Sequence, residues 1–464
     1  MKHEKILLDM LEKISPILHE IKTMGGTAYL VGGSVRDLVL ARPLKDFDIE
    51  VHGLDPVILE SILEKFGTVV LVGKQFGVLR LFHLDIDWSL PRRDSIGRKP
   101  TIFVDPTMTL EHACRRRDIT INAMALNLHE YHEYKELRII DLYGGLEDIK
   151  NKRLRAVDST LFTQDPLRFF RVMQFIGRFE MQPDLELTTI CKTMSLSDDT
   201  GPLARERIFE EIKKLCLKSR RPSLGFRWLE AIGRLHEIFP ELYALIGVPQ
   251  RKDYHPEGDV FEHSMQALDA AAQYDGYQDE DEKFLITIAA LCHDLGKPMT
   301  TDENLHCHGH DHAGVMPAQS LLKRITDDIF LSKAVSKLVR YHLAPFMLLR
   351  EGAGARAYKR LAAKLAPEVT MRQLGLVALA DHRGRNSESN EPLVLYQDKY
   401  DQFIAKAQEA NVVHKPEAPV LLGRHLLDDI PAGPKMGKLL DKAYEIQIDE
   451  GITDVEELKR RVLK

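Results

Sequence analysis

Two short stretches decide the fold at the start of this chain: LVGGSVRD at residues 30–37 and DFDIEV at residues 46–51. The apolar run at 27–31 predicts a strand that ends at a Gly-Gly turn, where a short helix begins. In the second stretch apolar and acidic residues alternate, which predicts a strand with one polar face. Because side chains alternate along a strand, Asp46 and Asp48 project from the same face.

This Asp-x-Asp pair has a chemical use. Two carboxylates this close repel each other unless a cation lies between them, and Mg²⁺ prefers such oxygen ligands together with phosphates. The Gly32-Gly33 turn lies thirteen residues before the pair, at a helix start whose backbone N–H groups can cradle a triphosphate. An isolated Asp-x-Asp is more often a solvated strand edge. Beside this turn, it favours a metal-dependent nucleotide site.

A third carboxylate follows on a later strand. Further strands are predicted at 68–72, 78–82 and 86–90. Asp87 could complete a two-metal site or deprotonate an attacking hydroxyl. Asp85 lies on the same face, so the sequence leaves the choice between the two acids open.

The hydrophobic pattern changes after about residue 148. Apolar residues recur at helical spacing from residue 165 onward, and the segment 259–400 is helical and rich in histidine. The fold class expected is therefore α+β, a head domain with a mixed sheet followed by all-α parts. The predicted divisions are an N-terminal helix (1–22), the head (23–148), a helical neck and body (149–240), a histidine-rich helical domain (241–400) and a helical tail (401–464).

Composition and charge restrict the partners and the compartment. The 464 residues carry a net charge of −6, which excludes a protein that binds nucleic acid non-specifically over its whole surface. Between residues 150 and 234, however, Lys and Arg exceed Asp and Glu by six, which suits a phosphate backbone. Five widely spaced cysteines without a CxxC pattern favour a reducing, cytoplasmic compartment. The N-terminal stretch has charges among its apolar residues and predicts an amphipathic helix rather than a signal peptide.

Six motifs occur along residues 25–235 in a characteristic order. After LVGGSVRD and DFDIEV come RRRDITINAMA (115–125), DLYGGLEDI (141–149), QDPLRFFRVMQF (164–175) and ARERIFEEI (204–212). In this order the chain resembles the class II tRNA nucleotidyltransferases, the CCA-adding enzymes of the polymerase β-like group. The resemblance implies tRNA as partner, CTP and ATP as substrates, and Mg²⁺ at Asp46 and Asp48. It also implies nucleotide-contacting roles for Gly32, Gly33, Arg36, Asp37, Arg117, Asp118, Asn122, Asp165, Arg168 and Arg171.

Base selection is the role that the resemblance gives to the motif at 164–175. Asp165 and Arg168 are i,i+3 neighbours on a predicted helix, so both can face an incoming base. A rigid carboxylate and guanidinium can pair with the edge of C or A and replace a template strand. Taken alone, the pair would more often be an intrahelical salt bridge. Gln164 departs from the family, where Glu is common.

A second constellation lies in the histidine-rich part. His263, His293-Asp294 and Asp381 follow the order His…His-Asp…Asp, which resembles the HD phosphohydrolase superfamily. Imidazole and carboxylate ligands suit Mn²⁺, Ni²⁺ or Co²⁺, which would activate a water against a phosphate ester. His310 and His342 could hold a second metal ion. The surplus histidines are expected in exposed loops: His255, His306, His308 and His312.

Three alternatives to a CCA-adding enzyme remain at this level. Bacterial poly(A) polymerase shares the Gly-Gly turn and the paired acids, but ARERIFEEI and the absence of a basic C-terminal extension disfavour it. An HD hydrolase with a degenerate head and a tRNA-binding chaperone would not need the intact acids. In the family that the chain resembles, the segment at 91–116 includes a loop that shifts base preference. Here the segment is long enough for an intact flexible loop, so the resemblance implies addition of all of CCA rather than CC alone.

Overall fold

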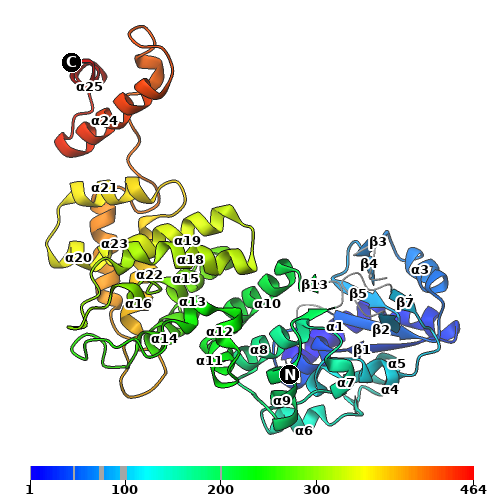
Figure 1. Cartoon of the computed structure of the whole chain (residues 1–464). Coiled ribbons are helices and arrows are strands. Elements are labelled where there is room, and N and C mark those ends of the chain that lie inside the picture. The colour runs from blue at the N-terminus through cyan, green and yellow to red at the C-terminus, as the bar shows by residue number, and fades with distance from the viewer. Residues whose placement is uncertain (1, 45–46, 73–77, 95–101, 199–200) are drawn as a thin grey trace. The chain divides into compact units, whose positions relative to one another are not determined.

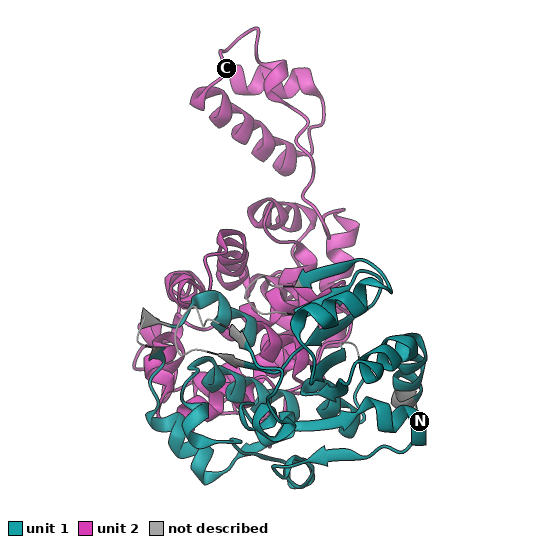
Figure 2. Ribbon diagram, turned by 90° about the vertical axis from the view of Figure 1, so that its right-hand side faces the viewer, with its two compact units in different colours: residues 1–212 teal, residues 213–464 magenta. Residues whose placement is uncertain are grey.

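The structure is a computed structural model that describes residues 2–44, 47–72, 78–94, 102–198 and 201–464. The chain forms two compact units, residues 1–212 and 213–464 (Figure 2). Among the described helices, none combines the length and the apolar character that a bilayer crossing requires.

A seven-stranded mixed sheet is the centre of unit 1 (Figure 1). Its strand order is β3-β4-β5-β2-β1-β8-β9, and β2 and β5 are its parallel pair while the other neighbours are antiparallel. The expected mixed sheet is thus confirmed. The strands are β1 (Thr27–Val31), β2 (Phe47–His52), β3 (Val69–Val72), β4 (Val78–Leu81), β5 (Ile86–Ser89), β8 (Met124–Asn127) and β9 (Ile139–Asp141).

The core of this unit covers one stripe of the N-terminal helix. Leu7, Leu11, Ile14 and Ile21 of α1 are buried in the same apolar cluster as Leu30 of β1, so the predicted amphipathic helix is confirmed. The remaining helices of unit 1 are α2 (Gly33–Val39), α3 (Pro56–Glu64), α4 (Leu110–Arg115), η1 (Thr120–Asn122), α5 (Leu128–Tyr134), α6 (Gly145–Lys150), α7 (Ser159–Phe162), α8 (Leu167–Phe179) and α9 (Leu185–Thr193), with α1 at Lys2–Thr23 and the start of α10 (Arg205–Lys218).

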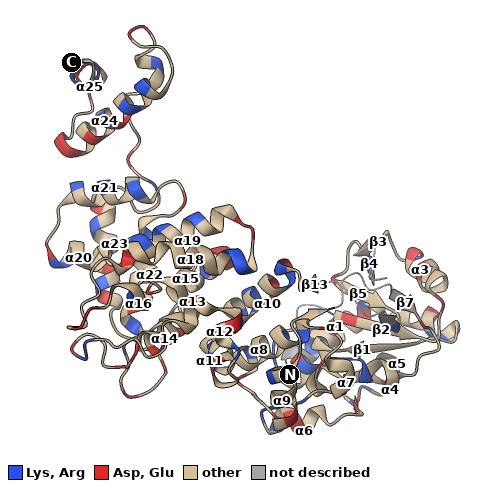
Figure 3. Ribbon diagram, viewed as in Figure 1, with Lys and Arg blue, Asp and Glu red and all other residues tan. Residues whose placement is uncertain are grey.

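The part after the sheet is mostly helical, with small exceptions to the all-α expectation. Two short ladders join β10 (Arg153–Leu154) to β11 (Gln182–Pro183) and β12 (Ser197–Asp198) to β13 (Gly201–Pro202). Within the head itself, β6 (Arg92–Asp94) pairs with β7 (Ile102–Val104) in a further two-stranded antiparallel ladder. Lys and Arg recur along α8 and α10, as Figure 3 shows.

Unit 2 is helical throughout the part that the structure describes. Two helices, α11 and α12, follow the start of this unit, and they are separated at Gly233, which takes a left-handed φ of 73°. The helices are α11 (Ser223–Ala231), α12 (Leu235–Ile238), α13 (Pro240–Tyr243), α14 (Val260–Ala272), α15 (Glu280–Cys292), α16 (Lys297–Thr300), α17 (His310–Ala313), α18 (Val315–Ile325), α19 (Ile329–Tyr341), α20 (Ala344–Arg350), α21 (Ala355–Leu365), α22 (Met371–Arg383), α23 (Gln397–Glu409), η2 (Gly423–His425), α24 (Pro434–Glu450) and α25 (Val455–Leu463).

Candidate active sites

The acidic site of the head is built on the parallel pair β2 and β5. Asp48 lies directly opposite Asp87 in the ladder register, so both carboxylates project from the same face of the sheet. The backbone N–H of Asp48 donates to Ser34 Oγ at 3.0 Å, which ties this strand to the Gly-Gly turn. Asp46 lies outside the described residues.

The structure separates the two candidates for the third carboxylate. Asp87 lies within β5 and forms an ion pair of 2.6 Å with Arg80 of β4. Asp85 is exposed and precedes the strand. Asp87 is therefore the one placed beside Asp48.

The Gly-Gly turn lies against the RRRD motif. Gly32 has a φ of 64°, and a Cβ at this position would be 2.6 Å from a guanidinium nitrogen of Arg117. A larger residue would therefore be strained and would displace Arg117. The turn brings together two motifs that lie about 85 residues apart in the sequence.

Arg36 is buried below this turn. One of its terminal nitrogens donates to Asn122 Oδ1 at 2.6 Å, and Nε donates to Asp37 Oδ1 at 2.9 Å. Its guanidinium lies 4.6 Å from the ring centre of Phe179, a cation–π geometry. Asp37 in turn pairs with Arg178 at 3.2 Å. Arg36 and Asp37 thus connect the turn to α8, and their contacts in the structure are internal to the protein.

Asp118 is the centre of a buried polar network. One carboxylate oxygen accepts from Asn122 Nδ2 at 2.9 Å, and the other accepts from Arg171 Nε at 2.7 Å. Burial alone would raise the pKa of Asp118, but Arg171 and Asn122 lower it to about 2. The carboxylate is therefore ionised throughout the neutral range and holds Arg171 in place.

Loss of this charge has a calculable effect on stability. We expect Asp118→Asn to lower the free energy of unfolding at pH 7 by about 2 kcal/mol, the equivalent of the lowered pKa. A carboxyl group whose pKa is lower in the folded protein stabilises the fold at pH values above its unfolded-state pKa near 4. This stabilisation is lost as the pH falls towards 2. The difference between wild type and variant should therefore narrow below about pH 4. Melting temperatures by calorimetry from pH 7 to pH 3 test this.

The matched control for Asp118→Asn is Asp281→Asn, because the Asp281 side chain is 89% exposed. It should leave the melting temperature nearly unchanged at every pH. A difference between wild type and Asp118→Asn that stays constant down to pH 3 would contradict a stabilising role for the charge.

The three predicted residues of the motif at 164–175 are placed differently from one another. Asp165 precedes Pro166 and α8, and it accepts from the backbone N–H of Leu167 at 3.0 Å. Its carboxylate also pairs with Arg207 of α10 at 3.3 Å. The sequence expectation put Asp165 on the same helix as Arg168, whereas in the structure Asp165 lies two residues before the first residue of α8.

Arg168 is held by backbone carbonyl groups rather than by Asp165. Its two terminal nitrogens donate to the carbonyl oxygens of Leu161 at 2.9 Å and Arg116 at 2.6 Å. Burial lowers the pKa of Arg168 somewhat, although the nearby carboxylates of Asp118 and Asp165 oppose this. The guanidinium is thus fixed in orientation, as a group that reads one ligand edge must be.

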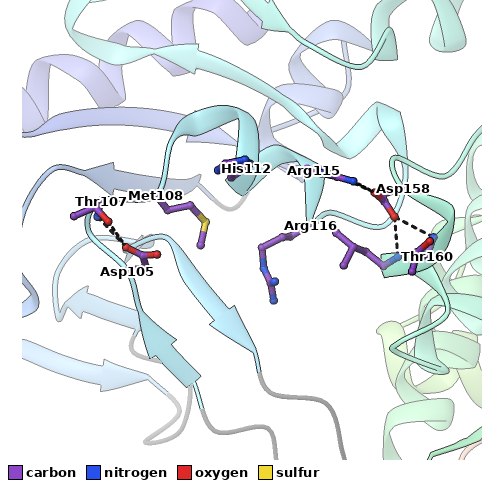
Figure 4. A pocket seen from close by; sticks show the side chains of 9 residues that line it. Asp105, Thr107, Met108, His112, Arg115, Arg116, Asp158 and Thr160 are labelled. Carbon is purple, nitrogen blue, oxygen red and sulfur yellow. Dashed lines mark hydrogen bonds and ion pairs between the residues drawn. The ribbon is translucent and has the colours of Figure 1, made fainter.

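A cavity of about 560 Å³ opens beside these carbonyl groups (Figure 4). Arg116 and Leu161, the two residues that accept from Arg168, both belong to its wall. Arg115 pairs with Asp158 at 2.7 Å on one side, and Arg116 extends into the open part. The cavity is within the size range of small-molecule sites.

The second candidate site lies between the helices of unit 2. His263 of α14, His293 and Asp294 after α15, and Asp381 of α22 are all less than 5% exposed. His263 Nε2 lies 3.1 Å from His293 Nε2, 3.5 Å from Asp294 Oδ2 and 3.3 Å from Asp381 Oδ1. The structure therefore brings all four predicted positions together.

His310 and His342 lie on the other side of Asp294. Their Nε2 atoms are 3.3 Å apart, at 3.3 Å and 3.9 Å respectively from Asp294 Oδ1. The backbone carbonyl groups of Cys307 and Val339 face their Nδ1 atoms at 2.7 Å, which leaves Nε2 available to a ligand. Asp294 is thus positioned between two groups of ligand atoms.

The donor set fits a metal ion. Asp294 Oδ2 lies 2.7 Å from Lys297 Nζ and 3.2 Å from His293 Nε2. Burial would raise the pKa of Asp294, but His293 and Lys297 hold it well below its usual range. Buried, ionised carboxylate oxygens beside imidazole nitrogens are the ligands of a transition metal.

Two residues of this site escape sequence reasoning. Glu257 Oε1 lies 2.7 Å from His263 Nδ1 and 2.9 Å from His255 Nδ1, so Glu257 fixes the tautomer of His263. Lys297 Nζ donates to Gln250 Oε1 at 2.6 Å as well as facing Asp294. His255 was expected in an exposed loop, but its side chain is only 15% exposed. Such supporting groups follow no fixed ligand spacing.

Comparison with known proteins gives matches to both the head and the histidine-rich part of the chain. A family model described as the Poly A polymerase head domain matches residues 28–155, and one described as the HD domain matches residues 260–385. The multifunctional CCA protein of Pasteurella multocida is 36% identical over 367 residues, which is 77% of this chain and 84% of the relative. That of Haemophilus influenzae is 33% identical over 394 residues, 83% and 91% of the two chains.

Solved structures share the fold at low sequence identity. The Bacillus stearothermophilus CCA-adding enzyme in complex with CTP has a TM-score of 0.63 at 19% identity, covering 96% of this chain and 95% of that chain. The Thermotoga maritima enzyme complexed with tRNA has a TM-score of 0.54 at 19% identity, covering 98% and 95%. Fold and sites together define a nucleotidyltransferase with a C-terminal HD domain. At the identities found along most of its length, the chain belongs to the family of multifunctional CCA proteins.

Proposed function

We propose that this enzyme adds CCA to the 3′ end of tRNA without a template, using CTP and ATP with Mg²⁺. The in-register acidic pair Asp48 and Asp87, tied to the Gly-Gly turn through Ser34, carries the proposal. Poly(A) polymerase shares the head model, but the curated relatives that span most of this chain are CCA proteins. The intact acidic pair also disfavours a degenerate head.

The residues of the head have three different roles in this proposal. Asp46, Asp48 and Asp87 would hold Mg²⁺, which supplies charge neutralisation at the triphosphate and activation of the attacking hydroxyl. Gly32, Gly33 and Arg117 would face the phosphates, because the turn has no side chain between its backbone and that guanidinium. Arg36, Asp37, Asp118, Asn122 and Arg171 fix the positions of the turn and α8 through buried contacts.

Base choice falls to Asp165 and Arg168 in this proposal. We expect Asp165→Ala to relax selection among CTP, ATP, UTP and GTP about tenfold, with a smaller loss of rate. A wrong base leaves polar groups unpaired at about 1–3 kcal/mol each, and the variant removes that penalty. The measurement is relative incorporation of the four nucleotides into a truncated tRNA.

The control for Asp165→Ala is Glu206→Ala, which removes an exposed carboxylate next to Arg207. It should keep the wild-type order of nucleotides. If Asp165→Ala also keeps that order, Asp165 is only a helix cap and partner of Arg207.

We further propose that all three nucleotides are added. The segment at 91–116, which includes β6, β7 and α4, has the length expected of an enzyme that adds all three. Three tRNA substrates test the point: one that ends at the discriminator base, one with a single added C and one with two. Addition to all three is expected, and a product that stops after CC would restrict the enzyme to CC addition.

A second, separate activity is proposed for the HD domain. His263, His293, Asp294 and Asp381 would hold one transition metal such as Ni²⁺, Mn²⁺ or Co²⁺, and Asp294, His310 and His342 a second. Bound there, the metal supplies an activated water for hydrolysis of phosphomonoesters or 2′,3′-cyclic phosphates. The position of Asp294 between the two ligand groups supports this proposal.

A further inference from the structure

The cavity above the HD cluster is far larger than a phosphate group requires. Its volume is about 1020 Å³, and its wall includes His310, His342 and Asp381 of the proposed metal site. Phe346, His382 and Tyr396 also line it. Cavities of this size hold whole organic ligands rather than single anionic groups.

These three rings come from three different elements that pack together. Phe346 lies on α20, His382 on α22, and Tyr396 directly before α23. The ring centres of Phe346 and His382 are 4.1 Å apart, and those of His382 and Tyr396 are 5.4 Å apart. The three rings are therefore one contiguous aromatic cluster in a cavity wall.

The aromatic cluster includes the residue directly after a proposed metal ligand. Asp381 and His382 are consecutive on α22, so their side chains diverge by about 100° around the helix. Asp381 faces His263 at 3.3 Å, whereas His382 faces Phe346. If the phosphate of a ligand lies at the His-Asp cluster, the group attached to that phosphate would thus contact the rings of Phe346, His382 and Tyr396.

We propose that Phe346, His382 and Tyr396 form a stacking platform for the nucleobase of a ribonucleotide whose phosphate ester is hydrolysed at the HD cluster. The inference rests on the proposed hydrolase and adds the part of the cavity that recognises the nucleoside attached to the phosphate ester. A base stacks on such rings without regard to its identity, because every base has a π face. The platform therefore favours nucleotides over aliphatic phosphate esters.

Charge and conformation support the assignment. The His382 ring lies between the other two rings and lines the cavity with them, so all three present aromatic surface to the same space. Tyr396 has a left-handed φ of 70°, a costly conformation for a side-chain-bearing residue that clusters at ligand sites. Lys399 lies 5.5 Å from the Tyr396 ring centre, and Lys399 and Arg350 line the same cavity, as suits an anionic ligand.

The test compares two cyclic phosphate esters on the full-length enzyme with Ni²⁺. Adenosine 2′,3′-cyclic monophosphate carries a base, and glycerol 1,2-cyclic phosphate does not. In Phe346→Ala, kcat/KM for the adenosine ester relative to the glycerol ester should fall about tenfold, within the range of base–aromatic stacking. Tyr396→Ala should act in the same direction, and Phe346→Tyr, which keeps a ring, should restore the ratio.

A second readout is independent of metal and turnover. Binding of adenosine 2′-monophosphate in EDTA, measured by equilibrium dialysis, should weaken about tenfold in Phe346→Ala. The control is Phe330→Ala, because Phe330 on α19 is 61% exposed and lies outside the cavity wall. A short RNA with a 3′-terminal cyclic phosphate should respond to Phe346→Ala like the free nucleotide if an RNA end is the source of the ligand. If Phe346→Ala affects the free nucleotide but not this RNA, the platform serves free nucleotides only.

The outcomes separate the platform from the hydrolase. An unchanged ester ratio together with unchanged dialysis in Phe346→Ala and Tyr396→Ala would overturn the platform while hydrolysis stands. Phe346-dependent nucleotide binding without hydrolysis of either ester under any divalent metal would overturn the hydrolase and leave the platform.

Discussion

Asp48→Asn is expected to lower the rate of nucleotide addition by at least about 10²–10³-fold, the range for loss of one pre-organised electrostatic contact at a reacting centre. The substitution keeps the side-chain size and removes the charge that would hold Mg²⁺ opposite Asp87. Affinity for tRNA should change little, because it arises from the basic excess of the helical part. Incorporation of labelled CTP or ATP and a tRNA filter-binding assay measure the two properties.

The control for Asp48→Asn is Asp85→Asn, since Asp85 is exposed and outside β5. It should retain near wild-type addition. Near wild-type addition by Asp48→Asn, or a loss of equal size in Asp85→Asn, would move the metal site away from the β2–β5 pair.

The sheet was predictable only where its strands have a clear pattern. The alternation in DFDIEV and the apolar run before the Gly-Gly turn predicted β2 and β1 to within a residue. β8, which pairs with β1 inside the sheet, was not predicted, because MALN is short and has no alternation. Asp165 illustrates a different limit: α8 begins only at Leu167, so Asp165 lies before the helix and accepts a hydrogen bond from its first backbone N–H.

Asp294→Asn is expected to lower hydrolysis of phosphate esters by more than about 10²-fold. Loss of an outer partner of a metal ligand already costs 10–100-fold in affinity or activity, and Asp294 would serve two ligand groups at once. Nucleotide addition with Mg²⁺ should persist, since none of its predicted residues belongs to the HD cluster. Turnover of bis(p-nitrophenyl) phosphate across Ni²⁺, Mn²⁺, Co²⁺ and Mg²⁺ measures the loss, and bound nickel per chain gives a readout without turnover.

The matched control for Asp294→Asn is Asp281→Asn, an exposed carboxylate in the same unit. It should keep both activities and the bound nickel. Two independent sites would be the wrong description if Asp294→Asn lost both activities while folded, or if its hydrolysis survived.

For the histidine cluster, the sequence predicted the ligand positions but not the residues that support them. The order of His263, His293-Asp294 and Asp381 was sufficient to select residues that the fold brings within 3.5 Å. Glu257 and the aromatic residues of the cavity gave no such signal, because their partners are set by the packing of distant helices. Only the tertiary structure shows these groups.

The register of β2 and β5 restricts how this protein can vary during evolution. Asp87 is followed by Trp88, which is fully buried. Deleting one residue inside β5 would place Trp88 opposite Asp48 and turn a carboxylate into the core. Insertions and deletions are therefore expected to be tolerated only beyond the ends of β5. The fixed length of β5 thus keeps Asp87 opposite Asp48.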